Sequence, residues 1–264
     1  MLGEKMKKNT LTLLFLVCVS LALYTTESVF SDTYNTNDVR NPRNIYAPRY
    51  DKDEILDNRR LKEIYNKEII EKNNISINAK QGTQLIFNTD ENTTVWNDNT
   101  FKKVISSNLS PSQERMFNVG DHVNIFAIVK SYHVVCKEQF NYSDGGIIKT
   151  SDVKPEEKAI YINIFGEKEL RTLTAKDKIT FKNNIVTLQE IDVRLRKSLM
   201  GDSKIKLYEY DSLYKKGFWD IHYKDGGIRH TNLFTYPDYT DNETIDMSKV
   251  SHFDVHLNED FSKD

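Results

Sequence analysis

The sequence predicts a mostly β protein of the α+β class, built from two domains. Strand-like segments occur in two blocks, one before residue 150 and one after residue 158. A polar stretch with a single proline, residues 149–158, separates the blocks and predicts the link between domains. In the second block an amphipathic segment, residues 187–200, predicts a helix packed across a sheet, which is the layer arrangement of α+β domains.

The first 31 residues have the pattern of a secretory signal peptide. A basic start precedes an apolar run over residues 11–23, which is shorter than the about 20 residues that a transmembrane helix needs. Val29 and Ser31 are small enough for a cleavage site, so we expect a mature chain that starts near Asp32. This predicts a secreted, extracellular protein without membrane insertion. Residues 32–49 are polar and predict an N-terminal arm.

Residues 50–150 predict one helix followed by a small barrel or sandwich. Apolar residues recur at helical spacing from position 53 to position 72, with Asp53 near the start of the predicted helix. Strand-like residues separated by turn signals then predict several short strands. These strands are expected at residues 75–77, 85–87, 93–96 and 122–129, and a short helix is expected to start near Ser110.

Residues 151–264 predict a second sheet with one long helix. Thr187 is expected to cap the helix of residues 187–200, with Glu190 completing a capping box. Strands are expected at residues 159–165, 169–174, 178–181, 206–209, 218–223, 228–234 and 250–257.

Composition and motifs argue against several classes of protein. The formal net charge is −2, which gives no electrostatic basis for binding nucleic acid. Cys136 is the one cysteine left after signal removal, so no intrachain disulfide can form and its role stays open. The sequence contains no nucleophile elbow, no zinc-protease helix motif and no phosphate-binding glycine loop. We therefore do not predict an enzyme.

The most informative segment lies near the C-terminus, where polar and apolar residues alternate. His252, Asp254 and His256 fall on one face of the predicted strand. A histidine and a carboxylate two positions apart project side by side, about 6–7 Å apart at the backbone, so both can reach one metal ion. His230, on a predicted neighbouring strand, is the candidate third ligand. These residue types suit Zn²⁺, and three protein ligands leave one tetrahedral position for water or for a partner molecule.

The other histidines are not predicted to be metal ligands. His256 lies about 13 Å from His252 along an extended strand and is expected to be a bystander or an outer-shell group. His222 is interpreted as a surface residue, and His122 and His133 receive no role.

The helix segment and the C-terminal segment together resemble the staphylococcal and streptococcal pyrogenic exotoxin family, the bacterial superantigens. The positions that match the family's helix signature are Val186, Ile191, Asp192, Arg196, Leu199, Leu207 and Tyr208. Asn183 stands where the family has a basic residue, and the loop before Leu207 is two residues longer. The family's glycine-glycine turn is retained only in part, at residues 144–147.

The resemblance implies an N-terminal OB-fold β-barrel, residues 50–150, and a C-terminal β-grasp domain, residues 151–264. It implies a superantigen that crosslinks MHC class II to the β-chain variable region of the T-cell receptor. It also implies Zn²⁺ held by His230, His252 and Asp254, with a fourth ligand from a histidine of the class II β chain. Such a bridge should weaken at acid pH as the histidines take up protons.

Two other functions remain open at this point. The free coordination position could be filled by a second copy of the chain, which would give a zinc-mediated homodimer. It could instead hold water in a secreted zinc-dependent hydrolase. The T-cell receptor contacts are unknown from the sequence, as is a second class II site on the barrel.

Overall fold

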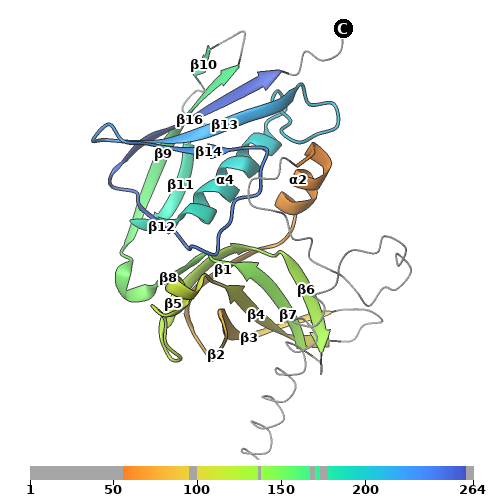
Figure 1. The fold of residues 1–264 in the computed structure, drawn as a ribbon, viewed down its shortest axis with the longest axis vertical. Helices are drawn as coiled ribbons and strands as arrows, with labels where there is room; N and C mark the ends of the chain where they lie inside the picture. Colours follow the sequence, from red (N-terminus) through yellow and green to blue (C-terminus); the bar gives the residue numbers. More distant parts are fainter. Residues whose placement is uncertain (1–55, 95–99, 136–137, 167–169, 173–177, 260–264) are drawn as a thin grey trace, which may run out of the picture.

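The structure is a computed structural model, and it describes residues 56–94, 100–135, 138–166, 170–172 and 178–259. The predicted signal peptide, the predicted N-terminal arm and Cys136 lie outside these residues. Two β-rich domains are stacked along the long axis of the molecule, the N-terminal domain below the C-terminal domain in Figure 1. Among the described helices, none combines the length and the apolar character needed to cross a membrane.

The described chain opens with a short helix, α2 (Asn58–Tyr65), and the first strand, β1 (Ile69–Ser76). The side chain of Asp57 caps α2 by accepting a hydrogen bond from the backbone N–H of Arg60. The predicted helix over residues 53–72 is therefore wrong beyond Tyr65, and its last four residues belong to β1. Ile69 and Ile70 continue the helical spacing, but they are β-branched and pair with Ile128 and Ala127, so tertiary pairing overrides the local pattern.

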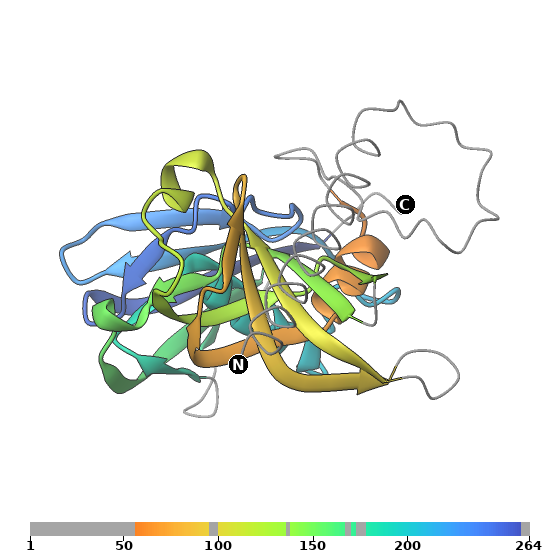
Figure 2. The ribbon, with the colours of Figure 1, turned by 90° about the horizontal axis from the view of Figure 1, so that it is seen from below.

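The N-terminal domain is a barrel made of two sheets. One sheet has the order β1-β5-β8, and the other has the order β2-β3-β4-β7-β6, in which β4 and β7 run parallel. Apolar side chains such as Leu85, Phe87 and Val123 fill the space between the sheets. Figure 2 shows β3 and β4 reaching beyond the barrel as a long hairpin. The bounds are β2 (Ala79–Gln81), β3 (Gln84–Thr94), β4 (Thr100–Asn108), α3 (Pro111–Glu114), β5 (His122–Ile128), β6 (Ser131–Val135), β7 (Glu138–Asp144), β8 (Ile147–Lys149) and the 3-10 turn η1 (Thr150–Asp152).

The C-terminal domain is a mixed sheet with one long helix on a single face. The strand order is β10-β9-β16-β13-β14, and β11 also pairs with β9. Strands β9 and β16 are parallel, whereas the other neighbours in this sheet are antiparallel. The bounds are β9 (Pro155–Gly166), β10 (Leu170–Thr172), β11 (Lys178–Asn183), β12 (Ile185–Thr187), α4 (Leu188–Gly201), β13 (Tyr214–Tyr223), β14 (Ile228–Asn232), β15 (Thr244–Asp246) and β16 (Val250–Glu259).

Helix α4 begins where the sequence predicts. The hydroxyl of Thr187 accepts a hydrogen bond from the backbone N–H of Glu190. The second half of the predicted capping box is not formed, because the Glu190 carboxylate binds Arg194 one turn later at 2.9 Å. The strand predicted at residues 206–209 is also wrong: Lys206 and Tyr208 have positive φ angles of 48° and 67°, which an extended strand does not allow.

The two domains share packing as well as a chain connection. Leu61, Ile64 and Tyr65 of α2 are buried in the core of the C-terminal domain, together with Phe126 of β5. The side-chain amide of Asn242 accepts from Ile147 N at 2.9 Å and donates to Ile147 O at 2.6 Å. The predicted mostly β, α+β fold of two domains is therefore confirmed, and one face of the C-terminal sheet is covered by α4 (Figure 1).

Candidate metal centre

The open face of the C-terminal sheet carries most of the histidines of the chain. In β16, Phe253, Val255 and Leu257 are buried in the core beneath the sheet. The residues between them, including His252 and Asp254, point to the other face. The alternation predicted for this strand is thus found in the structure.

His222, His252 and Asp254 converge on one point of this face. One ligand atom from each of the three residues lies within 4.8 Å of the other two. His222 lies directly opposite His252 in the antiparallel pair of β13 and β16, and their rings stack at 4.5 Å between centroids. Nε2 of His222 lies 2.9 Å from Oδ2 of Asp254, and Nε2 of His252 lies 3.4 Å from Oδ1.

His230 lies outside this cluster. Strand β13 separates β14 from β16, so the cross-strand neighbour of His230 is Asp220, and its Nδ1 lies 2.9 Å from Oδ1 of that residue. The His230 side chain is 60% exposed, against 13% for the Asp254 side chain. The structure therefore brings together two of the three predicted ligands and adds His222, which the sequence analysis interpreted as a surface residue.

Alternation in the sequence places His222 on the open face, but its position next to His252 depends on the order of the strands. Residues 218, 220 and 222 alternate with buried Trp219 and Ile221, so they share the open face. Only the pairing of β13 with β16 puts His222 next to His252. Such pairing is set by long-range packing, which one sequence does not reveal.

Two observations fit the cluster to a cation. Nε2 of His222 is buried and has no hydrogen-bond partner, because its close approach to Asp254 lacks hydrogen-bond geometry. Asp220 lies directly opposite Asp254 across the strands, an arrangement of like charges that destabilises a sheet. A bound cation would use the free nitrogen and offset the repulsion. Two imidazoles and one carboxylate are ligand types that Zn²⁺ accepts, at about 2.0–2.2 Å.

The next row of the same face is aromatic. The His256 ring stacks between Phe165 and Phe218 at 4.8 Å and 4.5 Å, and Phe218 also contacts His230 at 4.3 Å. His256 is thus held among rings, and its Nε2 lies 3.9 Å from Oδ2 of Asp220. His256 is outside the cluster of His222, His252 and Asp254, and its role as a bystander or an outer-shell group stays a prediction.

The charged residues of the helix signature lie in the core and not at the histidine cluster. Arg196 and Asp192 are both fully buried and form a two-point ion pair, with Nε of Arg196 2.8 Å from each Asp192 oxygen. Trp219 and Tyr65 donate further hydrogen bonds to Asp192 at 3.0 Å and 2.8 Å. Burial alone would lower the pKa of Arg196, but the Asp192 carboxylate raises it, so the guanidinium stays charged. This network holds α4, α2 and β13 together and is far from solvent.

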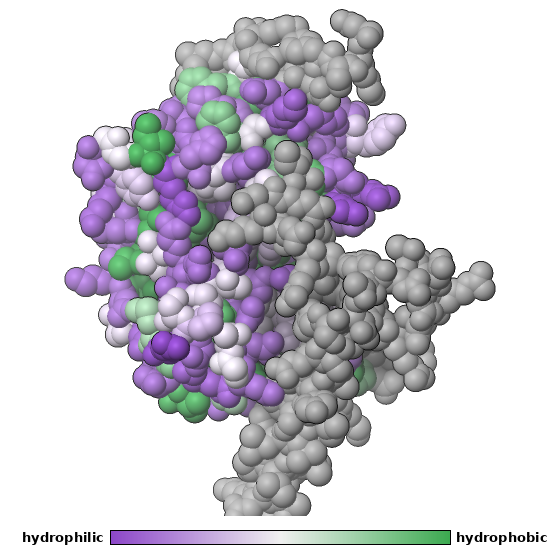
Figure 3. All heavy atoms as spheres, in the orientation of Figure 1, coloured by the Kyte–Doolittle hydropathy of each residue, from purple (hydrophilic) through white to green (hydrophobic). Residues whose placement is uncertain are grey.

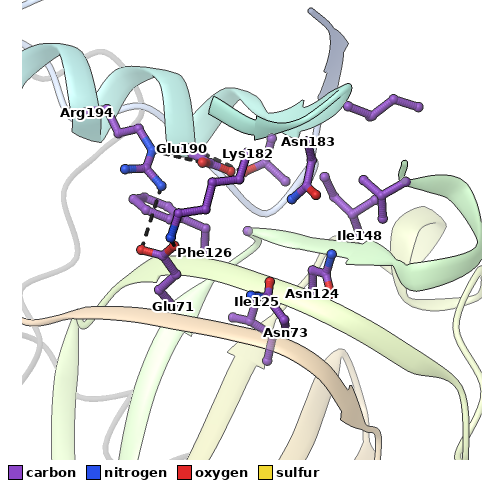
Figure 4. Close-up of a pocket in the computed structure, with 14 residues that line it drawn as sticks. Glu71, Asn73, Asn124, Ile125, Phe126, Ile148, Lys182, Asn183, Glu190 and Arg194 are labelled. Carbon is purple, nitrogen blue, oxygen red and sulfur yellow. Dashed lines mark hydrogen bonds and ion pairs between the residues drawn. The ribbon is translucent and has the colours of Figure 1, made fainter. Parts of the chain in front are cut away.

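A small cavity of about 30 Å³ lies at the junction of the two domains (Figure 4). Glu71 of β1 reaches up to Lys182 of β11 at 2.9 Å and to Arg194 of α4 at 3.7 Å. Arg194 also lies over the Phe126 ring, 4.5 Å from its centroid. The cavity has room for about one water molecule, and the charges around it connect the two domains.

Comparison with known proteins identifies the class. The profile described as the staphylococcal/streptococcal toxin OB-fold domain matches residues 60–149, and the beta-grasp domain of the same toxins matches residues 160–257. The chain therefore belongs to the staphylococcal/streptococcal toxin family, the family of superantigens and exotoxins. This confirms the family and the two folds that the resemblance implied.

Individual relatives agree with this assignment. A solved structure of a Streptococcus dysgalactiae-derived mitogen is 57% identical, covers 80% of this chain and 100% of its own, and has a TM-score of 0.69. Streptococcal pyrogenic exotoxin J is 23% identical, covers 75% of this chain and 93% of its own, and has a TM-score of 0.58, which shows a shared fold. Exotoxin type G of Streptococcus pyogenes serotype M3 is 26% identical over 53% of this chain. The match spans 62% of that relative's length.

These relatives are named as exotoxins and as a mitogen. The expectation of a toxin without catalytic activity agrees with them.

Proposed function

We propose that this chain is a secreted superantigen that joins MHC class II to the T-cell receptor β-chain variable region and activates T cells without specific peptide. Membership of the toxin family supports this function, as does 57% identity to a protein named a mitogen. The observation that carries the class II half is the convergence of two histidines and an aspartate on an open sheet face.

His222, His252 and Asp254 would hold the metal. Zn²⁺ bound by three protein side chains keeps one coordination position that a histidine of the class II β chain can occupy. The chain's own part is to orient two imidazoles and one carboxylate toward a face that no element of the described fold covers. His230 is excluded from the proposed ligand set because Asp220 lies between it and the cluster.

The test is binding of the purified mature chain to class II-positive and class II-negative cells, with zinc and after chelation. We expect zinc-dependent binding confined to class II-positive cells. His222→Ala and Asp254→Ala should abolish that binding while the far-UV circular dichroism spectrum and Tm stay unchanged. His230→Ala is the matched control, because it removes an imidazole from the same face, and it should retain zinc-dependent binding.

Each contrary result leads to a different conclusion. Retained binding in His222→Ala with loss in His230→Ala would restore the ligand set expected from the sequence. Loss of folding in Asp254→Ala would point to a structural metal. Binding that ignores chelation would move the class II contact to the barrel.

Two further assays separate the remaining functions. Zinc-dependent self-association in sedimentation experiments, together with no binding to cells, would favour the homodimer. Zinc-dependent turnover of peptides or esters would favour a hydrolase. Expansion of T cells sharing particular β-chain variable regions would establish the receptor half, for which no residues are assigned.

A further inference from the structure

The carboxylate of Asp254 is also bound by a residue of β9, on the side of β16 opposite His222. Asn163 of β9 lies directly across from Asp254 in the parallel pair of β9 and β16. Its side-chain Nδ2 donates a hydrogen bond to Oδ1 of Asp254 at 2.8 Å. The other oxygen, Oδ2, faces the unbonded Nε2 of His222.

This arrangement distinguishes the two oxygens of one carboxylate. The amide nitrogen of asparagine can only donate, so it fixes Oδ1 as an acceptor. Rotation of the Asp254 carboxylate about its last torsion is otherwise broad, and the hydrogen bond restricts that rotation. Oδ2 is then presented to the point where His222 converges. Outer groups of this kind orient metal ligands and tune their basicity.

The position of Asn163 makes a purely structural role a poor explanation. Its chain neighbours Ile162 and Ile164 are buried in the core, whereas Asn163 is only half-buried on the open face. The core therefore does not depend on the Asn163 side chain, and the amide can be changed without opening a cavity.

We infer that Asn163 is a positioning residue for the metal centre, a role that rests on the proposed zinc site. It is not a ligand. Through Asp254 it makes strand β9 part of a site whose three ligands come from β13 and β16, so metal affinity depends on three adjacent strands of the sheet.

The test compares zinc affinity of the full mature chain and of Asn163→Leu, which has similar volume but no donor. Loss of an outer-shell partner lowers metal affinity by about 10–100-fold, so the zinc Kd from competition with a chromogenic chelator should rise by that factor. The Tm of the zinc-free protein should not change. Asn258→Leu is the matched control, because Asn258 is an exposed residue of the same strand as Asp254, beyond the cluster, and its zinc Kd should match the parent.

A double-variant cycle tests the route through Asp254. In an Asp254→Ala background, which retains the two histidines, Asn163→Leu should no longer change the residual zinc Kd. An equal loss in both backgrounds would overturn the inference, and so would a parental Kd in Asn163→Leu. If the parent chain itself does not bind zinc, the metal centre and this inference fail together, whereas a zinc-binding parent with an indifferent Asn163→Leu removes the inference alone.

Discussion

At the scale of single residues, Arg196 and Asp192 of the helix signature are charged but fully buried. Two charges removed from water are tolerated when each is paired and hydrogen-bonded. Asp192 receives bonds from Arg196, Trp219 and Tyr65, and Nη2 of Arg196 donates to the Asn232 carbonyl at 2.9 Å. The charged side chains of this pair are thus part of the core and are absent from any binding face.

Arg196→Met should lower the free energy of unfolding by about 3–5 kcal/mol, because it leaves Asp192 buried without a counter-charge. Urea denaturation followed by tryptophan fluorescence measures this loss. The double variant Arg196→Met/Asp192→Asn should be more stable than Arg196→Met alone. A double variant that is less stable would show that the hydrogen bonds of Asp192 matter more than its uncompensated charge.

The sequence pattern alone identifies only some of the candidate metal ligands on the open face of the C-terminal sheet. Alternation alone put His252 and Asp254 on one side of a strand, and this holds in the structure. The third member could not be chosen in the same way, because His222 and His230 both lie on the open face. What separates them is that β13, and not β14, is the neighbour of β16, and strand order depends on the packing of the whole sheet.

At the scale of elements, the start of α4 was predictable from its cap, whereas the start of α2 was predicted near Asp53 and lies instead just after Asp57. Thr187 precedes α4 and Asp57 precedes α2, and both side chains bind the backbone N–H three residues later. The end of α2 was missed because Ile69 and Ile70 fit a helical stripe and a strand equally well. Their pairing with β5 decides the outcome, and that partner is more than fifty positions away in the sequence.

Thr187→Ala should lower the free energy of unfolding by about 1 kcal/mol, because the N–H of Glu190 loses its acceptor in a buried position. Thr187→Ser keeps the hydroxyl and should stay within about half that loss of the parent. Urea denaturation of the three proteins measures the difference. Equal stability of the alanine variant and the parent would mean that β12 pairing, and not the cap, fixes the start of α4.

At the scale of the whole molecule, the domains are joined by a buried helix, by Asn242 and by the charges around Glu71 (Figure 4). The surface shown in Figure 3 is largely hydrophilic, with apolar residues scattered over it. The two domains are thus connected by apolar, hydrogen-bonded and charged contacts.

Glu190, at the junction of the two domains, should make the free energy of unfolding depend on pH. Burial raises the pKa of Glu190 above its ordinary value of 4.5, and Arg194 opposes the shift only in part. Because the folded pKa is higher than the unfolded pKa, the stability linked to Glu190 is fully present below the unfolded pKa and is lost as pH rises through the folded pKa. In Glu190→Gln, the free energy of unfolding should therefore fall less than in the parent as pH rises above 4.5.

Urea denaturation over a series of pH values measures the two curves. Glu157→Gln, at an exposed position of β9, should follow the parent curve. Parallel curves for Glu190→Gln and the parent would show that Arg194 offsets the burial of this carboxyl completely.

The central position of β16 in its sheet has a consequence for the order of folding. Strand β16 lies in the middle of the sheet, between β9 and β13, yet it follows every other described strand in the chain. While a ribosome is still making the segment before Val250, β9 and β13 have no strand to join them, and the core beneath them cannot close. The sheet of the C-terminal domain can therefore close only after β16 has been synthesised.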